Sequence, residues 1–209
     1  MKRASLVAGV LAFVLIWGGP LLSVWRESFA AHMLAHMGVV AIAAPLIAIG
    51  ISDRMPPLNP ALAVVASLVE LVVVWGWHMP AARQWAETSL GATILEQGMF
   101  LAAGLLLWLT SFALARTAAQ LASGAFALLL TSIHMTLLGA LLSLASRPLY
   151  GAGEVTCFGV VLDARQDQTL GGVTMLAVGA AVYLAGGIIL LSRLLDGRGE
   201  KAPEGSSPG

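Results

Sequence analysis

HMLAHM, residues 32–37, begins an apolar run that ends near Ile51. About 20 mostly apolar residues are enough to cross a bilayer as a helix, so this run predicts a membrane span. His32 and His36 are four residues apart, which puts both imidazoles on one face of that helix. Polar side chains are costly inside a membrane and usually face the bundle interior or an aqueous cavity. The stretch therefore predicts a spanning helix whose polar face serves a function.

The composition of the whole chain indicates an integral membrane protein. Of its 209 residues, 58% are hydrophobic and 11% are charged, against about 45–50% and about 25% in soluble domains. The net charge is zero and no basic cluster is present, which argues against nucleic acid as a partner and leaves membrane lipid as the surroundings. The single cysteine, Cys157, excludes an internal disulfide. We expect a small apolar filler there, with a soft-metal ligand or a link to another chain as the alternatives.

Six segments are long and apolar enough to span a membrane. They are residues 4–24, 29–51, 59–80, 90–113, 118–145 and 170–192. We therefore expect an all-α fold, a polytopic transmembrane helix bundle that forms one domain over residues 1–195. The composition of residues 196–209 predicts a disordered cytoplasmic tail.

The connections between the spans carry further predictions. The segment AARQWAETS, residues 81–89, predicts a short helix at the membrane interface, and residues 146–169 predict a loop. No small-x-small cleavage site closes the first apolar run, so we expect a retained helix there rather than a signal peptide.

Basic residues predict the orientation of the bundle, because cytoplasmic segments carry an excess of Lys and Arg. Seven fall on the side of the N-terminus, namely Lys2, Arg3, Arg54, Arg116, Arg193, Arg198 and Lys201. Four fall on the other side, namely Arg26, Arg83, Arg147 and Arg165. We expect both termini in the cytoplasm and the loop 146–169 outside, which for a bacterial inner membrane is the periplasm.

With this orientation all four histidines fall in the outer half of the membrane. His32 and His36 lie in the outer third of the second span, His78 at the outer end of the third, and His134 in the outer half of the fifth. Each of them is followed directly by a methionine. Imidazole binds copper, zinc or iron, and thioether sulfur selects Cu(I). The pattern predicts a copper site built by histidines and methionines from separate spans.

Simpler interpretations stand beside this one. A histidine in a membrane helix can serve as a hydrogen-bond partner for another helix, and the methionines can serve as flexible packing. Glu70 is either a proton or ion relay or a protonated acid bonded to a neighbouring helix. Four glycines are expected to let helices approach closely: Gly104, Gly139, Gly171 and Gly172.

Five blocks of the chain, in order over residues 29–180, resemble the caa3-type cytochrome c oxidase assembly factor family. They are HMLAHM with APLIAIG, then WGWHMP, LEQGMFLAAGLLLW, HMTLLGALLSLASRPLYG and DARQDQTLGGVTM. One such block is a weak signal, whereas five in sequence are specific. One position departs from the family, where Glu-His is replaced by Glu96-Gln97. Gln is a poor ligand for Cu(I), so the number of ions held stays open.

The resemblance implies a polytopic inner-membrane protein that helps to insert copper into a haem-copper oxidase. Carried over to this chain, it implies metal ligands at His32, His36, His78, His134 and Met175. In this interpretation Glu96 and Asp167 orient imidazole N–H groups, and Arg147, in the Arg-Pro turn, anchors the outer loop.

The function that we expect is transfer of Cu(I) by ligand exchange, from a copper donor protein to a subunit of the haem-copper oxidase, with no enzymatic step. One rival is a b-type haem protein with two histidines as axial ligands. Another is a membrane hydrolase that uses a metal-bound water, although the chain lacks the His-Glu-x-x-His pattern. A third is an accessory oxidase subunit whose polar groups serve only helix packing.

Overall fold

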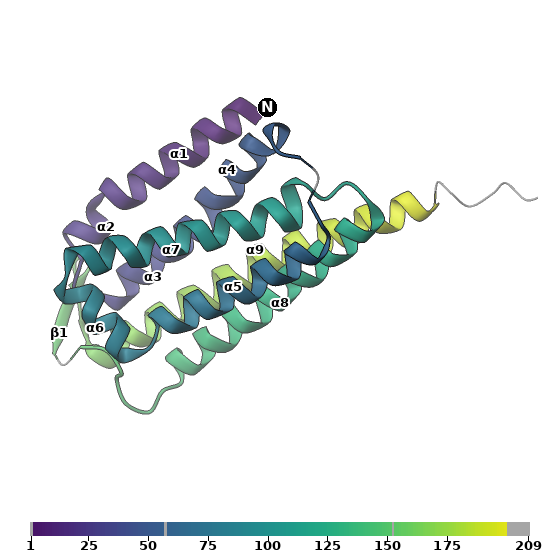
Figure 1. Cartoon of the computed structure of the whole chain (residues 1–209). Coiled ribbons are helices and arrows are strands. Elements are labelled where there is room, and N and C mark those ends of the chain that lie inside the picture. The colour runs from purple at the N-terminus through teal and green to yellow at the C-terminus, as the bar shows by residue number, and fades with distance from the viewer. Residues whose placement is uncertain (1, 57, 152, 200–209) are drawn as a thin grey trace, which may run out of the picture.

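The computed structural model describes residues 2–56, 58–151 and 153–199 and shows a bundle of long helices with a small β-hairpin at one end (Figure 1). The helices are α1 (Lys2–Gly18), α2 (Pro20–Ser23), α3 (Phe29–Gly38), α4 (Ala44–Ile51), α5 (Ala61–Trp77), α6 (Pro80–Thr88), α7 (Leu90–Trp108), α8 (Ala118–Ser143) and α9 (Ala164–Gly199). π-helical turns at Val39–Ala43 and Leu109–Ala113 follow α3 and α7, and a 3-10 turn at Ser52–Arg54 follows α4. The end of the bundle that carries α2, α6 and the hairpin is called the hairpin end below.

Four helical segments among the described residues are long and apolar enough to cross a membrane: Phe29–Ile51, Leu90–Ala113, Ala118–Ser143 and Ala164–Asp196. A fifth span results if α5 and α6 are counted together, although the chain bends by 72° between them. The fold is therefore the predicted all-α polytopic bundle. It has fewer full-length spans than the six expected, because α1 ends after 17 residues, where Gly-Gly-Pro interrupts the helix.

Two glycines bring α1 into contact with α4. A Cβ at Gly9 would stand 2.8 Å from Ile47, and one at Gly50 would stand 2.6 Å from Leu6. Small residues let helix backbones approach this closely. The first apolar segment is thus packed into the bundle.

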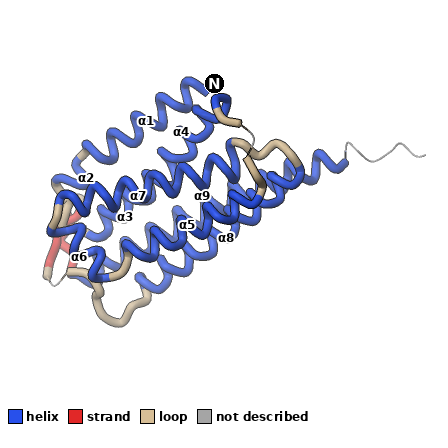
Figure 2. Tube along the Cα trace, in the orientation of Figure 1, coloured by secondary structure: helices blue, strands red, loops and turns tan. Residues whose placement is uncertain are grey.

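The segment 146–169, which was predicted as a loop, contains regular structure. Strands β1 (Glu154–Cys157) and β2 (Val160–Asp163) pair antiparallel, with Phe158 and Gly159 in the turn at φ of 50° and 80°. Two positive φ angles match the twist of a two-residue hairpin turn, and glycine adopts such an angle without strain. Directly after β2, α9 begins at Ala164 rather than at residue 170 (Figure 2).

The predicted glycine contacts are present between α8 and α9. A Cβ at Gly139 would stand 2.7 Å from the carbonyl oxygen of Gly172, and one at Gly172 would stand 2.7 Å from the backbone nitrogen of Ser143. This close approach holds α9 against α8 near the hairpin end. At its other end α9 stops at Gly199, and residues 200–209 of the predicted tail, with Lys201, lie outside the described residues.

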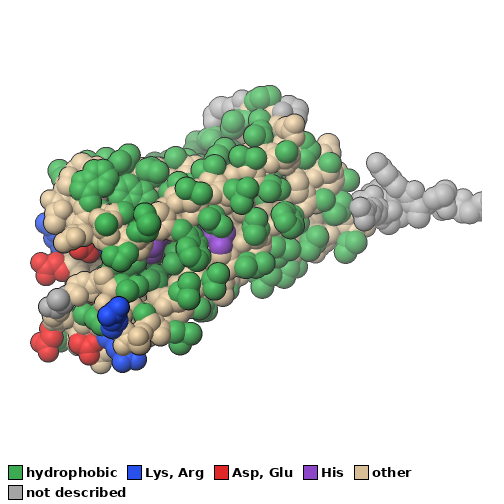
Figure 3. Space-filling model, turned by 60° about the horizontal axis from the view of Figure 1, so that its bottom comes forward, with side chains coloured by type: hydrophobic (Ala, Val, Ile, Leu, Met, Phe, Trp, Pro, Cys, Tyr) green, Lys and Arg blue, Asp and Glu red, His purple; other side chains and the backbone are tan. Residues whose placement is uncertain are grey.

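One face of the bundle is apolar along most of its length (Figure 3). Figure 3 shows hydrophobic side chains over most of one face, with acidic and basic side chains gathered at the hairpin end. Such a belt is what lipid requires of the surface of a spanning bundle. The polar side chains inside the bundle therefore need partners from the protein itself.

Candidate functional site

The first turn of α3 is held by a carboxylate from α9. Asp167 accepts hydrogen bonds from the Ser28 hydroxyl at 2.7 Å and from the backbone N–H groups of Phe29 at 2.6 Å and Ala30 at 3.1 Å. A carboxylate at a helix N-terminus satisfies N–H groups that have no partner within the helix. Asp167 was predicted to orient an imidazole; it positions His32 and His36 instead through the start of their helix.

Glu96 contacts an imidazole, as predicted, but an arginine lies beside the pair. The carboxylate of Glu96 is 3.3 Å from Nε2 of His32. Nη1 of Arg83 lies 3.0 Å from Nδ1 and 3.1 Å from Nε2 of the same ring. Cε1 stands between the two ring nitrogens, so an atom this close to both of them would collide with Cε1 if it lay in the plane of the ring. Nη1 therefore lies over the face of the ring rather than along either lone pair. The guanidinium therefore covers His32.

Arg83 also contacts two carboxylates. Its Nη1 is 3.7 Å from Glu96, and its Nε is 3.1 Å from Glu87, one turn further along α6. The bend between α5 and α6 turns this short helix so that Arg83 is only 5% exposed. Sequence reasoning treated Arg83 only as an outer basic residue. The available signal was its i,i+4 spacing from Glu87 on an amphipathic segment.

His78 presents a free nitrogen to a methionine sulfur. Its Nδ1 lies 2.6 Å from the carbonyl oxygen of Val74, and its Nε2 lies 3.3 Å from Sδ of Met33. A carbonyl only accepts, so Nδ1 carries the proton, and in the neutral ring Nε2 has only a lone pair. A thioether sulfur has no proton to donate either. Two lone pairs from different helices therefore face each other.

His36 completes a group of three histidines. Its ring centroid is 5.8 Å from that of His78 and 3.9 Å from that of Phe100, on α7. Both of its ring nitrogens are buried without a hydrogen-bond partner in the described structure. Buried polar groups normally have such a partner, so an unpartnered imidazole indicates a place for a ligand.

Four buried methionines lie on α3, α8 and α9, and one of them contacts His78. They are Met33, Met37, Met135 and Met175, each at most 1% exposed. Gly171, one turn before Met175, faces Met33. Gly179, one turn after Met175, faces Met37 and Met135. Met175 thus lies on the face of α9 that meets α3 and α8, and we call these four side chains the methionine cluster.

Two other predicted residues stay outside the group of three histidines. Both ring nitrogens of His134 are buried without a hydrogen-bond partner, and no ring of the described residues stacks on it. Arg147 is exposed, and its side chain forms no hydrogen bond or ion pair with the described part of the chain. Neither residue forms a hydrogen bond, ion pair or ring contact with the other predicted ligands in the described structure.

Tyr150 and Gln168 hold the loop that Arg147 was expected to anchor. Tyr150 donates its hydroxyl to the backbone carbonyl of His78 at 2.5 Å, and burial raises the pKa of that hydroxyl to about 12. Gln168 accepts from the backbone N–H of Leu149 at 2.6 Å and donates to the carbonyl of Leu142 at 2.9 Å. Both side chains are buried, and both connect the loop to the hairpin end of the bundle.

Gln97, at the position where the family has histidine, is also buried. Its amide nitrogen lies 3.4 Å from the carboxylate of Glu96, and its amide oxygen has no partner in the described structure. Gln97 and Phe100 are three residues apart on α7 and so share a face. Gln97 therefore lies on the side of α7 that Phe100 turns toward His36.

Glu70 lies deeper in the bundle and bonds to a neighbouring helix. It accepts a hydrogen bond from Tyr183 at 2.9 Å, while its second oxygen has no partner in the described structure. Ser67 and Thr131 share a hydrogen bond of 2.8 Å nearby, between α5 and α8. Both the relay and the packing interpretations of Glu70 remain compatible with these contacts.

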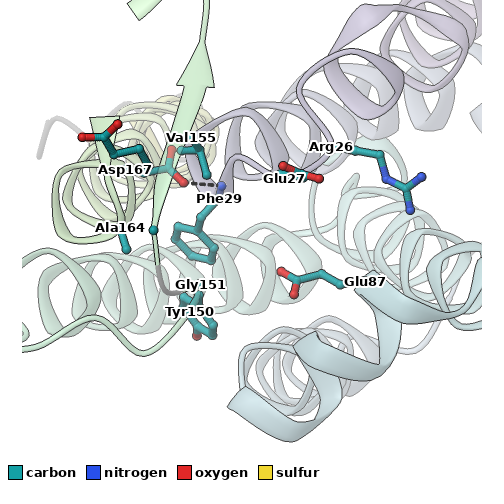
Figure 4. Close-up of a pocket in the computed structure, with 11 residues that line it drawn as sticks. Arg26, Glu27, Phe29, Glu87, Tyr150, Gly151, Val155, Ala164 and Asp167 are labelled. Atoms are coloured by element: carbon teal, nitrogen blue, oxygen red, sulfur yellow. Dashed lines mark hydrogen bonds between the residues drawn. The ribbon is translucent and has the colours of Figure 1, made fainter. Parts of the chain in front are cut away.

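Two pockets open at the hairpin end. One, of about 350 Å³, is lined by His32, Arg83 and Glu87 together with Arg26 from the neighbouring loop. The other, of about 450 Å³, shares Arg26 and Glu87 and reaches Asp167. Figure 4 shows the wall of this second pocket, where Phe29 lies between Asp167 and Tyr150. His32 lines the smaller of these two pockets.

The available donors favour a soft ion over a hard one. Within residues 2–56, 58–151 and 153–199, no three His, Cys, Asp or Glu side chains are grouped so as to hold a metal ion. Cys157 is buried against Ala30 and Ala31, as expected of an apolar filler. The ligands that do converge are imidazole nitrogen and thioether sulfur, a set that suits Cu(I).

Comparison with known proteins identifies one related family. The family described as cytochrome c oxidase caa3 assembly factor matches residues 1–196, nearly the whole chain. The match confirms the resemblance inferred from the five sequence blocks. Among curated proteins and among solved structures, no match was found.

Proposed function

Because the chain belongs to the cytochrome c oxidase caa3 assembly factor family, we propose that it assists assembly of the oxidase by carrying Cu(I). The ion is the cargo, held between Met33, His36 and His78 and then passed to a subunit of the oxidase. A copper donor protein supplies it at the hairpin end. We place the protein in the bacterial inner membrane with this end on the periplasmic side.

The observation that carries the proposal is the contact between His78 and Met33. Nε2 and Sδ face each other at 3.3 Å, with no proton between them in the neutral state of the ring. Two lone pairs at this distance repel unless a positive charge lies between them. Cu(I) provides that charge and binds both imidazole and thioether well.

His36 supplies the third donor. His36 is fully buried, and its ring centroid is 5.8 Å from that of His78. Both of its ring nitrogens lack a hydrogen-bond partner in the described structure and are available to bind. The Val74 carbonyl fixes the orientation of His78 by accepting from Nδ1, as outer partners of metal-binding histidines commonly do. No carboxylate belongs to this set, which disfavours hard cations relative to Cu(I).

The methionine cluster supports release as well as binding. Thioethers bind Cu(I) reversibly and differ little from one another, so an ion can pass between them by ligand exchange without redox chemistry. Met37, Met135 and Met175 offer such positions beside Met33. No catalytic step is assigned to the protein.

Titration of the purified protein with Cu(I) under reducing conditions tests the proposal. A chromogenic Cu(I) chelator serves as competitor, and we expect one tightly bound ion per chain. Met33→Leu keeps the shape of the side chain and removes the sulfur; this variant and His78→Ala should each weaken binding at least about tenfold, ~1.4 kcal/mol. Met79→Leu is the matched control, because Met79 follows His78 but is 59% exposed.

Three results would contradict the proposal. The first is wild-type protein that binds no Cu(I), and the second is binding that Met33→Leu, His36→Ala and His78→Ala leave unchanged. The third is a Soret absorption band in the purified protein, which would assign the histidines to haem. Full metallation of the oxidase after deletion of the chain would instead favour an accessory role in helix packing.

A further inference from the structure

A second set of metal-binding groups surrounds Arg83, beside the pocket of about 350 Å³. His32 and Glu96 are in contact at 3.3 Å, and Glu87 lies 3.1 Å from Nε of Arg83. Imidazole with carboxylates is a ligand set of divalent ions such as Zn²⁺. Glu87 contacts Nε of Arg83, whereas Glu96 and His32 face Nη1. Within the described part of the chain these three donors are not grouped so as to hold a metal ion.

We propose that Arg83 is a built-in cation that keeps divalent ions out of the His32–Glu96 position. The guanidinium covers the face of the imidazole and neutralises the buried carboxylate, so a divalent ion there would meet a fixed positive charge within contact distance. Repulsion between like charges is strong in a buried site. Arg83 thereby sets which ions can bind where the pocket at the hairpin end meets His32.

Burial distinguishes this arginine from an ordinary surface ion pair. Arg83 is 5% exposed, Glu96 is 1% exposed and His32 is 4% exposed, yet Arg83 and His32 line a pocket of about 350 Å³ and Glu96 contacts both of them. The pocket is large enough to admit a hydrated ion, since one water needs about 30 Å³. Without Arg83, the imidazole of His32 would line the pocket, with the carboxylate of Glu96 in contact with it.

The biological meaning of this selectivity rests on the proposed function, because Cu(I) must reach Met33, His36 and His78 past His32. Without Arg83, the His32–Glu96 pair would bind Zn²⁺ at the entrance and obstruct that path. Zn²⁺ binding is measured separately from Cu(I) binding, so failure of the copper proposal and failure of this one give different results.

The test is Zn²⁺ titration of purified protein with a fluorescent zinc indicator as competitor. We expect wild-type protein to hold no Zn²⁺ at His32 and Arg83→Gln to bind one ion, at least about tenfold more tightly than wild type. Gln retains a hydrogen-bond donor toward Glu96, so this variant protects the fold better than Arg83→Met. Adding His32→Ala to Arg83→Gln should abolish the gain.

Two controls separate exclusion of ions from structural support. Arg83→Lys retains the charge and should bind no more Zn²⁺ than wild type. Arg26→Gln removes a charge from the rim of the same pocket without touching His32 and should also resemble wild type. A role in folding alone predicts lower thermal stability in Arg83→Gln but no gain in Zn²⁺ binding.

The proposal is overturned if folded Arg83→Gln binds Zn²⁺ as wild type does, or if the gain persists without His32. If no Arg83 variant folds, the effect of Zn²⁺ on Cu(I) uptake by the wild-type protein tests the proposal instead. Excess Zn²⁺ should leave its Cu(I) uptake unchanged; inhibition that disappears in His32→Ala would show that Arg83 does not exclude the ion.

Discussion

The hydroxyl of Tyr150 donates to the backbone carbonyl of His78 at 2.5 Å. This bond joins the loop after α8 to the break between α5 and α6, 72 residues away in sequence. The carbonyl that accepts this bond belongs to the residue whose ring faces Met33. The outer loop therefore supports the backbone that carries the candidate copper ligand His78.

Tyr150→Phe tests this connection between the loop and His78. The variant leaves a buried carbonyl without a partner, which destabilises a fold by about 1–3 kcal/mol, while the stacking of the ring on Phe29 is retained. We expect a lower midpoint of unfolding in mixed detergent micelles and weaker Cu(I) binding with unchanged stoichiometry. Unchanged stability would show that the hydroxyl bond is not formed.

The same hydroxyl predicts a stability change at high pH. Burial raises the pKa of Tyr150 to about 12, above its ordinary value of 10. Between pH 10 and 12 the unfolded state ionises while the folded state stays neutral, so the contribution of Tyr150 to stability is complete below pH 10 and is lost as pH rises through this window. The wild-type protein should lose more stability there than Tyr150→Phe; parallel pH profiles would contradict the assignment.

Asp167→Asn tests the support of α3. The amide cannot accept from the Ser28 hydroxyl and two backbone N–H groups as a carboxylate does, and charge-assisted bonds contribute about 1.5–3 kcal/mol. We expect a loss of stability in that range and weaker Cu(I) binding, because Met33 and His36 lie on this helix. Glu154→Gln changes an exposed carboxylate on the same pocket and should leave both quantities unaltered. If Asp167→Asn bound Cu(I) as tightly as wild type does, the contacts of Asp167 with the start of α3 would not be required for copper binding.

Gln97→His introduces the residue that the family resemblance implies at this position. The new imidazole would lie beside Glu96 on the face of α7 that carries Phe100. We expect Cu(I) binding to strengthen about tenfold, ~1.4 kcal/mol, as measured by chelator competition. A variant that folds but binds Cu(I) as wild type does would show that position 97 is not reached by the ion.

Gly139→Ala tests the crossing of α8 and α9. The new methyl would stand 2.7 Å from the backbone of α9, so the helices must separate. We expect a loss of at least about 1–3 kcal/mol and reduced yield of folded protein in detergent. Gly98→Ala is the control, since a Cβ there meets nothing within 4 Å; equal effects of the two substitutions would argue against a tight crossing.

The sequence alone determined that this is a polytopic helical membrane protein and that its histidines lie toward one end. Both conclusions depend on local quantities, the length of each apolar run and the position of a residue along it, because the bilayer acts on every segment in the same way. The five blocks added the family, which the match over residues 1–196 confirms.

Only the tertiary structure decided which side chains meet. The rotation of each helix about its axis, and the 72° bend after α5, depend on contacts between distant segments such as Gly139 with Gly172. Those contacts place Arg83 over His32, Met33 against His78 and Asp167 at the start of α3, and they place no ring on His134. Spacing along one helix cannot specify these pairs, because they are formed by packing between helices rather than by the local chain.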